Sequence, residues 1–590
     1  MRAEFALFAA AAALSIVALL VAPPRIGRSW RVPSAVLLAF LGAITPLVVY
    51  QFLDPSLAAG RALWEWSAAG GPTIQASYRL DALAAVAITV GAAYAGAGLL
   101  ASARTLAGPR ALPALVLAIG FAFIATVVAD DVVAATVGLA VVAAATAFTT
   151  LVVAPAPSAL RFAAYLAIGL QGFVVATLLI ASRGGASLVL AEVPASAVSP
   201  GALLAATTGA ALFAGLYPFV PWRYERAHAP MAEREPLRGL LAMPAGVAAS
   251  FILLRLLGAT SVDPAMLALP SAGVALRAVL ATGVLATFVV RARRRGRASR
   301  RAVIVTALAL AILAAYPELR WSHIVLAAAL VTVLYAAAVS LALPEQWEVA
   351  RHDVTLATLW VAFAVGTPLA IGAGLFALVG AAIGALAESV STAPHRAYLA
   401  TVATAAWRVT GIMGVGLGAI GSADPVIAVA ATAMVALALA LELVQAGRRL
   451  LLLRDAPPDL EIAAGVAALI GTALLGTMLA QPIPSAVAEL GLLLGPLDPS
   501  LAIGVAVLSA LAVVVARRAR PLLPALERLA ARLQDFVWAA DPVPAGIAAF
   551  RALERAVTLS SAGFALFEQR AGVWLATILI VALLIWSARP

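Results

Sequence analysis

Hydrophobic residues occur along this chain in long unbroken runs rather than in alternation with polar ones. The stretches 111–129 and 322–343, for example, are apolar on every face of a helix. Runs of about 18 to 24 residues recur from one end to the other, and each is long enough to cross a hydrocarbon core of roughly 30 Å as an α-helix. A transmembrane β-barrel would instead show short segments of alternating polarity. The pattern therefore predicts an all-α, polytopic transmembrane helix bundle.

The composition excludes a water-soluble globular protein and several kinds of cofactor site. Hydrophobic residues make up 64% of the 590 residues and charged residues 11%, which is typical of a chain surrounded by lipid. The absence of cysteine excludes disulfides, iron–sulfur clusters and thiolate zinc sites within this chain. The histidines fall in or beside predicted loops, and no two have helical ligand spacing, so we expect neither a metal nor a redox cofactor. They are His228, His323, His352 and His395.

Arginines concentrate in alternate loops between the predicted spans. Over the first ten spans, the odd-numbered loops contain seventeen arginines, whereas the amino-terminal end and the even-numbered loops contain only four. Because cytoplasmic loops are enriched in positive charge, we expect the odd loops in the cytoplasm and the amino terminus outside, in a bacterial inner membrane. The net charge of +11 then reflects topology, and no nucleic-acid partner is expected.

The alternation of arginine-rich and arginine-poor loops, here called charge parity, also decides how many spans the stretch 354–388 contains. Gly366-Thr367-Pro368 interrupts this stretch, which forms either one broken helix or two short spans. Two spans bring the later arginine clusters at 448–454 and 517–520 into the cytoplasm, and one span forces them outside. We therefore expect two spans here and about 16 to 18 in the whole chain.

The chain divides into three predicted segments. Residues 1–130 form amino-terminal spans, beginning with a retained helix rather than a cleaved signal peptide. Residues 131–519 form the transmembrane core. In residues 520–590, charged and apolar side chains first interleave at helical spacing, and an apolar run follows. This pattern predicts amphipathic lateral helices on the cytoplasmic face and a final anchoring span, with a solvated loop as the alternative to the lateral helices.

Three stretches, in order, carry a resemblance to a known family. The first is 78–83, Tyr-Arg-Leu-Asp-Ala-Leu; the second is 217–222, Tyr-Pro-Phe-Val-Pro-Trp; the third begins at 235 with Glu-Pro-Leu-Arg-Gly-Leu-Leu-Ala and ends with Leu-Leu-Arg at 253–255. They resemble the antiporter-like membrane subunits of respiratory complex I, of membrane-bound hydrogenases and of multisubunit cation/proton antiporters. The positions that match the family motifs are Asp81, Pro218, Trp222 and Pro236.

The resemblance implies a proton path, and this sequence departs from it. The family uses a glutamate in the fifth span, lysines in the seventh and a later broken span, and a histidine or lysine in the eighth. Here the first of these positions is Ala140, the seventh-span lysine is replaced by Phe213, and the eighth-span residue is replaced by Ala242. Arg408 lies close to the position of the later lysine. The resemblance therefore implies a relay that has lost most of its exchanging groups.

All 39 basic residues of the chain are arginine. A bias toward GC-rich codons accounts for this without any function, but the physical consequence is the same. Neutralising an arginine at pH 7 costs roughly 9 kcal/mol, against roughly 5 kcal/mol for a lysine. A buried arginine is therefore a fixed charge rather than a proton carrier.

Polar residues inside the apolar runs form a candidate intramembrane axis. Arg408 lies near the middle of its predicted span, where an isolated charge costs about 3 kcal/mol or more, so it must face protein or water. It either sets the field of a polar axis or holds helices together through one carboxylate or backbone carbonyls. For Gln171 and Arg277, hydrogen bonds in helix packing are the simpler explanation. The full candidate axis is Arg408, Arg277, Gln171, Glu388 and Glu442.

The sequence thus predicts an antiporter-like, proton-translocation-type membrane subunit of a complex I-related respiratory assembly, with a degenerate relay and without a cofactor of its own. Its partners would be lipid and other membrane subunits of a hetero-oligomeric complex. Two alternatives stay open. One is the membrane subunit of an inorganic-carbon uptake complex that pairs with a soluble zinc protein, and the other is a non-pumping structural scaffold.

Overall fold

The computed structural model describes most of the bundle between residues 60 and 492. The described ranges are 16–17, 60–67, 73–104, 111–183, 188–219 without 191 and 218, 235–259, 320–343, 346–390, 394–452 and 482–492, together with isolated positions from 507 to 558. Contacts divide the chain into a unit of residues 1–274 and 317–537 and a unit of residues 275–316 and 538–590. Every helix and strand bounded below belongs to the first unit.

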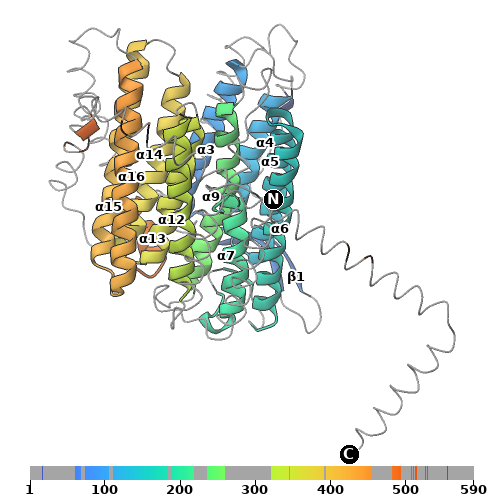
Figure 1. Ribbon diagram of the computed structural model, residues 1–590. Coiled ribbons are helices and arrows are strands. Elements are labelled where there is room, and N and C mark those ends of the chain that lie inside the picture. Colours follow the sequence, from blue (N-terminus) through green and yellow to red (C-terminus); the bar gives the residue numbers. More distant parts are fainter. Residues whose placement is uncertain are drawn as a thin grey trace, which may run out of the picture. The chain divides into compact units, whose positions relative to one another are not determined.

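Twelve α-helices of the described ranges build this unit (Figure 1). The first six are α3 (Ala82–Arg104), α4 (Leu112–Val127), α5 (Val132–Val153), α6 (Ala156–Ala181), α7 (Pro200–Ala214) and α9 (Glu235–Ala259). The other six are α12 (Trp321–Ala342), α13 (Trp347–Val365), α14 (Pro368–Val390), α15 (Pro394–Ile420), α16 (Pro425–Leu452) and α18 (Pro482–Glu489). Helix α3 packs on α4, α9, α14 and α18, and α9 packs on α3, α5, α7 and α13. These two helices therefore join a half that contains α4, α5 and α7 to a half that contains α13, α14 and α18.

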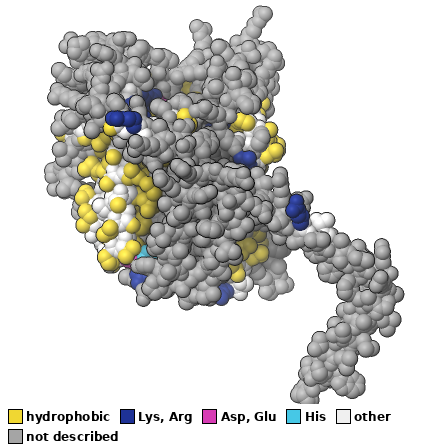
Figure 2. All heavy atoms as spheres, in the orientation of Figure 1, with side chains coloured by type: hydrophobic (Ala, Val, Ile, Leu, Met, Phe, Trp, Pro, Cys, Tyr) yellow, Lys and Arg dark blue, Asp and Glu magenta, His cyan; other side chains and the backbone are white. Residues whose placement is uncertain are grey.

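The helices have the length and apolar composition of membrane spans. Within the described residues, eight of them satisfy both criteria: α3, α5, α6, α9, α12, α14, α15 and α16. Helices α4 and α7 are apolar but shorter, with 16 and 15 residues. Outward-facing side chains are also hydrophobic, as in Phe148 of α5, Ile168 of α6, Ile420 of α15 and Val429 of α16. Figure 2 shows such side chains gathered over α15 and α16. The chain is a multi-pass membrane protein.

The interrupted stretch near Gly366 forms two antiparallel helices, as charge parity predicted. Helix α13 ends at Val365, Gly366 has a φ of 70°, and α14 begins at Pro368. A left-handed backbone conformation strains residues that have a side chain, but glycine adopts it at little cost in free energy. The chain can therefore reverse its direction here within two residues. A Cβ on Gly374 would lie 2.8 Å from the Cβ of Ala362, which shows how closely the two helices pack.

A two-stranded hairpin precedes α3 and was not expected from the all-α pattern. Strand β1 (Arg61–Ser67) pairs antiparallel with β2 (Thr73–Tyr78), with Ser67 opposite Thr73. Short strands of this kind lie outside the apolar runs, so the run length that predicts spans carries no information about them. A 3₁₀ helix, η2 (Ala195–Ala197), precedes α7. The predicted lateral helices and final span at 520–590 lie outside the described residues, apart from isolated positions.

Candidate functional site

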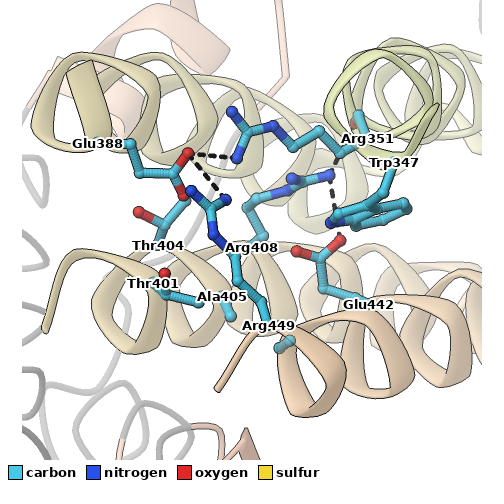
Figure 3. Close-up of a pocket in the computed structure, with 10 residues that line it drawn as sticks. Trp347, Arg351, Glu388, Thr401, Thr404, Ala405, Arg408, Glu442 and Arg449 are labelled. Carbon is cyan, nitrogen blue, oxygen red and sulfur yellow. Dashed lines mark hydrogen bonds and ion pairs between the residues drawn. The ribbon is translucent and has the colours of Figure 1, made fainter. Parts of the chain in front are cut away.

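Helices α13 to α16 enclose a group of charged side chains (Figure 3). They lie within or at the end of segments that are otherwise apolar, which explains why their charges must compensate one another. Three are arginines and three are glutamates, so their formal charges balance. We call this group the charge network: Glu348, Arg351, Glu388, Arg408, Glu442 and Arg449.

Four members of the charge network form a ring of ion pairs. Arg351 contacts Glu348 at 2.7 Å and also pairs with Glu388. Arg449 contacts the same two carboxylates, at 2.8 Å for Glu348 and 3.2 Å for Glu388. Each guanidinium therefore bridges the same two glutamates, and the ring connects α13, α14 and α16. Multiple donors in a fixed planar fork make arginine well suited to this role.

The remaining pair, Arg408 and Glu442, is buried more deeply. Their side chains are 3% and 5% exposed, and Arg408 Nη2 lies 3.1 Å from Glu442 Oε2. The same nitrogen donates to the backbone carbonyl of Arg351 at 2.7 Å, and the guanidinium lies 5.7 Å from the ring centre of Trp347. Removing two charges from water costs several kcal/mol each. The mutual contact and the carbonyl of Arg351 offset part of this cost, although Arg408 Nε and Glu442 Oε2 have no hydrogen-bond partner among the described residues.

A small cavity lies among these side chains. Its walls also include Thr401 and Thr404 of α15, whose hydroxyls donate to backbone carbonyls of their own helix. The space open to a water-sized sphere is about 10 Å³, which is roughly the room needed by one water molecule among polar groups. A single water could therefore contact the charged groups without opening the bundle.

Two titratable side chains adjoin the charge network on its α3 and α9 side. Tyr94 of α3 and His352 of α13 are 1% and 2% exposed. Their ring centres are 5.7 Å apart, in an edge-to-face arrangement. His352, which we expected in or beside a loop, lies in the second turn of α13. The charges at 348–353 suggested the end of a span, but α13 begins at Trp347 and buries them through partners on other helices. His323 also lies within a helix, at the start of α12.

Three of the five candidate axis residues come together in the structure. Arg408, Glu388 and Glu442 all line the cavity. Gln171 lies exposed on α6 and contributes nothing to the charge network, and Arg277 lies outside the described residues. Sequence reasoning missed Glu348, Arg351, Arg449, Tyr94 and His352. Tyr94, in the middle of an apolar run, gave no signal. The signal of the other four was a cluster of charges at the edge of an apolar run, which is also the signal of an ordinary span boundary.

Two of the three positions that the resemblance assigns to the family relay are packed in the core of the bundle. Phe213 is fully buried in α7 and packs edge-to-face on Phe173 of α6, with ring centres 6.1 Å apart. Ala242 is fully buried in α9, and Ala140 lies half-buried in α5. Phe213 and Ala242 are therefore part of the hydrophobic packing between α6, α7 and α9.

Asp81, a family-motif position, anchors a second group of charges at the start of α3. Both oxygens accept from Arg255 of α9, at 2.7 and 2.8 Å, and Oδ1 also accepts from the backbone of Ala84. Glu489 of α18 accepts from the backbone of Ala82 and Leu83, at 2.8 and 3.0 Å. The start of α3 is thus held by two distant segments. Of the other motif positions, Pro236 lies in the first turn of α9, and Pro218 and Trp222 lie outside the described residues.

Asp130 and Asp131 precede α5 and have different roles. Asp131 accepts from the backbone of Val133 and Ala134, so it caps the amino-terminal end of α5. Asp130 instead pairs with Arg79 at 3.3 Å. Burial raises the pKa of both carboxyl groups, and this effect outweighs the opposing influence of Arg79 on Asp130 and of the backbone donors on Asp131.

Asp424 caps α16 and connects it to α12. Its Oδ1 accepts from Val426, and its Oδ2 lies 3.2 Å from His323 Nε2 and 3.5 Å from Arg320 Nη1. Partial burial raises the pKa of this carboxyl, but the backbone donors Val426 and Ile427 and the contact with His323 outweigh it, so the pKa is lowered.

Three solved structures resemble this bundle. A chain of the Mrp complex from Dietzia sp. DQ12-45-1b matches with a TM-score of 0.60 at 18% identity, covering 100% of this chain and 63% of that one. A chain of the membrane-bound sulfane sulfur reductase, an archaeal respiratory membrane complex, matches with a TM-score of 0.54 at 14% identity, covering 85% of this chain and 98% of that one. A chain of respiratory complex I from Thermus thermophilus with bound NADH matches with a TM-score of 0.54 at 16% identity, covering 82% of this chain and 99% of that one.

The chain has the fold of an antiporter-like membrane subunit. This is the fold that the three sequence stretches implied. No protein-family model and no curated protein matches the sequence, and the identities to the solved structures are low, so the likeness concerns the fold. The chain spans 63% of the length of the Mrp chain that it matches. On this antiporter-like fold, the charge network occupies the half built from α13 to α16.

Proposed function

We propose that this chain is a proton-translocation-type, antiporter-like subunit of a multi-subunit membrane assembly related to complex I, and that it contains no redox centre of its own. The observation that carries the proposal is the charge network on four helices of a membrane bundle. The side chains of Arg351, Glu388, Arg408 and Glu442 are 9% exposed or less, and those of Glu348 and Arg449 are 31% and 29% exposed. Charges in such a place are expensive and are found chiefly where ions or protons move. The likeness to chains of the Mrp complex, the sulfane sulfur reductase and complex I supports the same kind of function.

Glu442 is the group through which a proton would act on the charge network. When Glu442 gains a proton, Arg408 loses the carboxylate that compensates it at 3.1 Å. Arg408 cannot become neutral at a tolerable cost. Its guanidinium must then rely on the Arg351 carbonyl and on the other carboxylates, so α13, α15 and α16 change their mutual attraction. Proton occupancy at one buried carboxyl is thereby coupled to helix packing.

The proton path of this chain is degenerate in our proposal. Ala140, Phe213 and Ala242 offer no ionisable group, and Arg408 replaces a lysine by a fixed charge. Proton exchange would then depend on the glutamates of the charge network, in the half of the bundle from α13 to α16.

A non-pumping scaffold is the second candidate, and one observation favours it. The charges of the network balance, and the ring of Arg351, Arg449 and two glutamates resembles a structural clamp across three helices. Such a clamp would orient helices without exchanging protons. Proton flux separates the two candidates, because neutralising Glu442 changes flux only if the charge network conducts.

Purification in a mild detergent, followed by mass spectrometry of the subunits, tests the proposed assembly. We expect several other membrane subunits and a redox module to accompany the chain. Recovery of a single, monodisperse chain would contradict the proposal. Recovery with one large zinc-bearing partner, and without flavin or iron, would instead favour the inorganic-carbon alternative.

A further inference from the structure

Two carboxylates from distant parts of the chain meet at the start of α3. An α-helix leaves its first backbone N–H groups without a partner inside the helix. Here Glu489, the last residue of α18, accepts from the N–H groups of Ala82 and Leu83 at 2.8 and 3.0 Å, with one oxygen for each. Asp81 accepts from the next N–H group, that of Ala84, at 2.7 Å. Two acidic side chains therefore share the amino-terminal end of one helix.

One arginine of the described residues lies against these two carboxylates. Arg255 of α9 donates to both oxygens of Asp81, at 2.7 and 2.8 Å, so its guanidinium is engaged by that carboxylate. Among the described residues, the hydrogen bonds that Glu489 accepts come from the backbone alone. The neighbouring pair of Arg79 and Asp130 adds no net charge. When all five side chains are ionised, the group therefore has one negative charge in excess.

The segment that carries Glu489 packs on three helices. Helix α18 packs on α3 and α14. Leu490 lies against α9, since a Cβ added to Gly258 would be 3.0 Å from Leu490 Cδ2 and 3.3 Å from its Cα. Helix α14 brings no charge to this contact, because its one charged residue, Glu388, belongs to the charge network. We call the contact between residues 482–490 and the start of α3 the acid clasp.

The acid clasp and the charge network lie near opposite ends of α9. Near the start of α9, a Cβ added to Gly239 would be 3.6 Å from the carbonyl oxygen of Glu348, a member of the charge network. Arg255 lies sixteen positions further along, from 239 to 255, which is about 24 Å at 1.5 Å per helical residue. Glu489 is an exposed residue, so it can exchange protons with water directly. The acid clasp is therefore a separate group of charges that faces water.

Glu489 holds a proton more readily in this position than it would in water. Partial burial and the neighbouring charge of Asp81 raise the pKa of Glu489, and these effects outweigh the backbone donors and Arg255, which lower it. A group whose pKa is raised by docking binds its proton more tightly in the docked state. Docking of residues 482–490 is therefore favoured as the pH falls through the window between the pKa of a free glutamate and the raised value.

We propose that the acid clasp is a pH-sensitive contact, in which protonation of Glu489 strengthens the docking of residues 482–490 on the start of α3. A protonated carboxyl group still accepts from a backbone N–H through its carbonyl oxygen, so the contact persists. Its repulsion from Asp81 ends, and Arg255 then balances Asp81 alone. When Glu489 loses its proton to water, the repulsion returns and docking weakens. This inference does not depend on proton translocation, because no member of the charge network takes part.

Hydrogen exchange of backbone amides, measured by mass spectrometry on the purified protein in detergent, tests the inference. The measured quantity is the exchange rate of peptides that contain residues 82–84 and 482–490, divided at each pH by the rate for the same sequences without structure. In the unmodified protein, we expect this ratio to rise by at least about threefold from about pH 5 to about pH 8. Glu489→Gln keeps an acceptor oxygen without a charge and should give a low ratio at every pH. Glu489→Ala removes the acceptor and should give a high ratio at every pH.

Glu65→Gln is the matched control, because it makes the same chemical change at an exposed glutamate of β1. We expect it to keep the pH dependence of the unmodified protein. A ratio that stays constant or falls as the pH rises in the unmodified protein would overturn the inference. A pH dependence that survives in Glu489→Gln would overturn it too, since another group would then be its cause. Proton flux plays no part in this measurement, so failure of the inference leaves the proposed function standing.

Discussion

At the scale of single residues, Arg408 shows how a cation is accommodated deep in an apolar bundle. One carboxylate at 3.1 Å and one carbonyl at 2.7 Å meet its guanidinium, and an aromatic ring lies nearby. The sequence alone indicates that Arg408 needs partners. Glu388 and Glu442 were candidates because they lie near the ends of predicted spans. It could not reveal Arg351, because the charges at 348–353 look like a solvated boundary until their distant partners are known.

Replacing Arg408 by glutamine should destabilise the protein strongly. Glu442 would remain as a buried carboxylate without its counter-ion, at a cost of about 3 to 5 kcal/mol. We expect the midpoint of thermal unfolding in detergent to fall well below that of Arg183→Gln, which removes an exposed arginine beyond α6. The double variant Arg408→Gln with Glu442→Gln should recover part of the loss. Equal midpoints for Arg408→Gln and Arg183→Gln would show that the pair is not buried as described.

Asp130 predicts a pH dependence of stability with a definite sign. Burial raises its pKa in the folded chain above the ordinary value of about 3.9. The folded state therefore binds a proton more readily than the unfolded state, so stability increases as the pH falls through the window between the two pKa values. We expect the midpoint of thermal unfolding to rise as the pH falls through this window. In Asp130→Asn, we expect this rise to be smaller. A variant that keeps the full increase would contradict the assignment to Asp130.

At the scale of elements, glycines set the spacing of α14 and α15. A Cβ on Gly411 would lie 2.5 Å from the Cβ and 2.7 Å from the Cα of Ala377, so the two backbones are in contact there. Small residues at helix interfaces are typical of membrane bundles, where close packing replaces the hydrophobic effect. The run length of apolar residues predicted the helices, but which face of each would carry the contact depended on neighbours far along the chain.

Gly411→Ala should therefore force α14 and α15 apart. Overpacking of a close interface costs about 1 to 3 kcal/mol, which a thermal unfolding assay in detergent would detect. Gly201→Ala is the matched control, because the nearest atoms to its new Cβ lie at 3.8 Å. The control should be neutral or slightly stabilising, since alanine favours helix. If both variants unfold at the same temperature, the packing of α14 on α15 is looser than described.

The elements that the sequence predicted correctly are those with a clear physical signal in it. Apolar run length gave the helices, and charge parity resolved the stretch around Gly366 into α13 and α14. The hairpin of β1 and β2 escaped, because its strands are short and lie outside the runs. The start of α13 was placed too late, because its buried charges resemble a boundary when their partners are unknown.

At the scale of the whole molecule, the charge network occupies one part of the described bundle. It lies among α13 to α16, whereas the positions on α5, α7 and α9 that the resemblance assigns to a relay are apolar. The three stretches that carry the resemblance indicated the fold, and the solved structures of membrane complexes share it. This placement leads to our central claim that the charge network moves protons.

Proton flux across vesicles that contain the purified assembly tests this claim most directly, with the unmodified chain compared with Glu442→Gln. Glutamine keeps the shape of the side chain and one hydrogen-bond acceptor, but it cannot carry a proton. A conducting network predicts a fall in flux of at least about tenfold, with the same subunits recovered from both samples. Equal flux from two equally complete assemblies would contradict the claim and leave the charge network as a structural clamp.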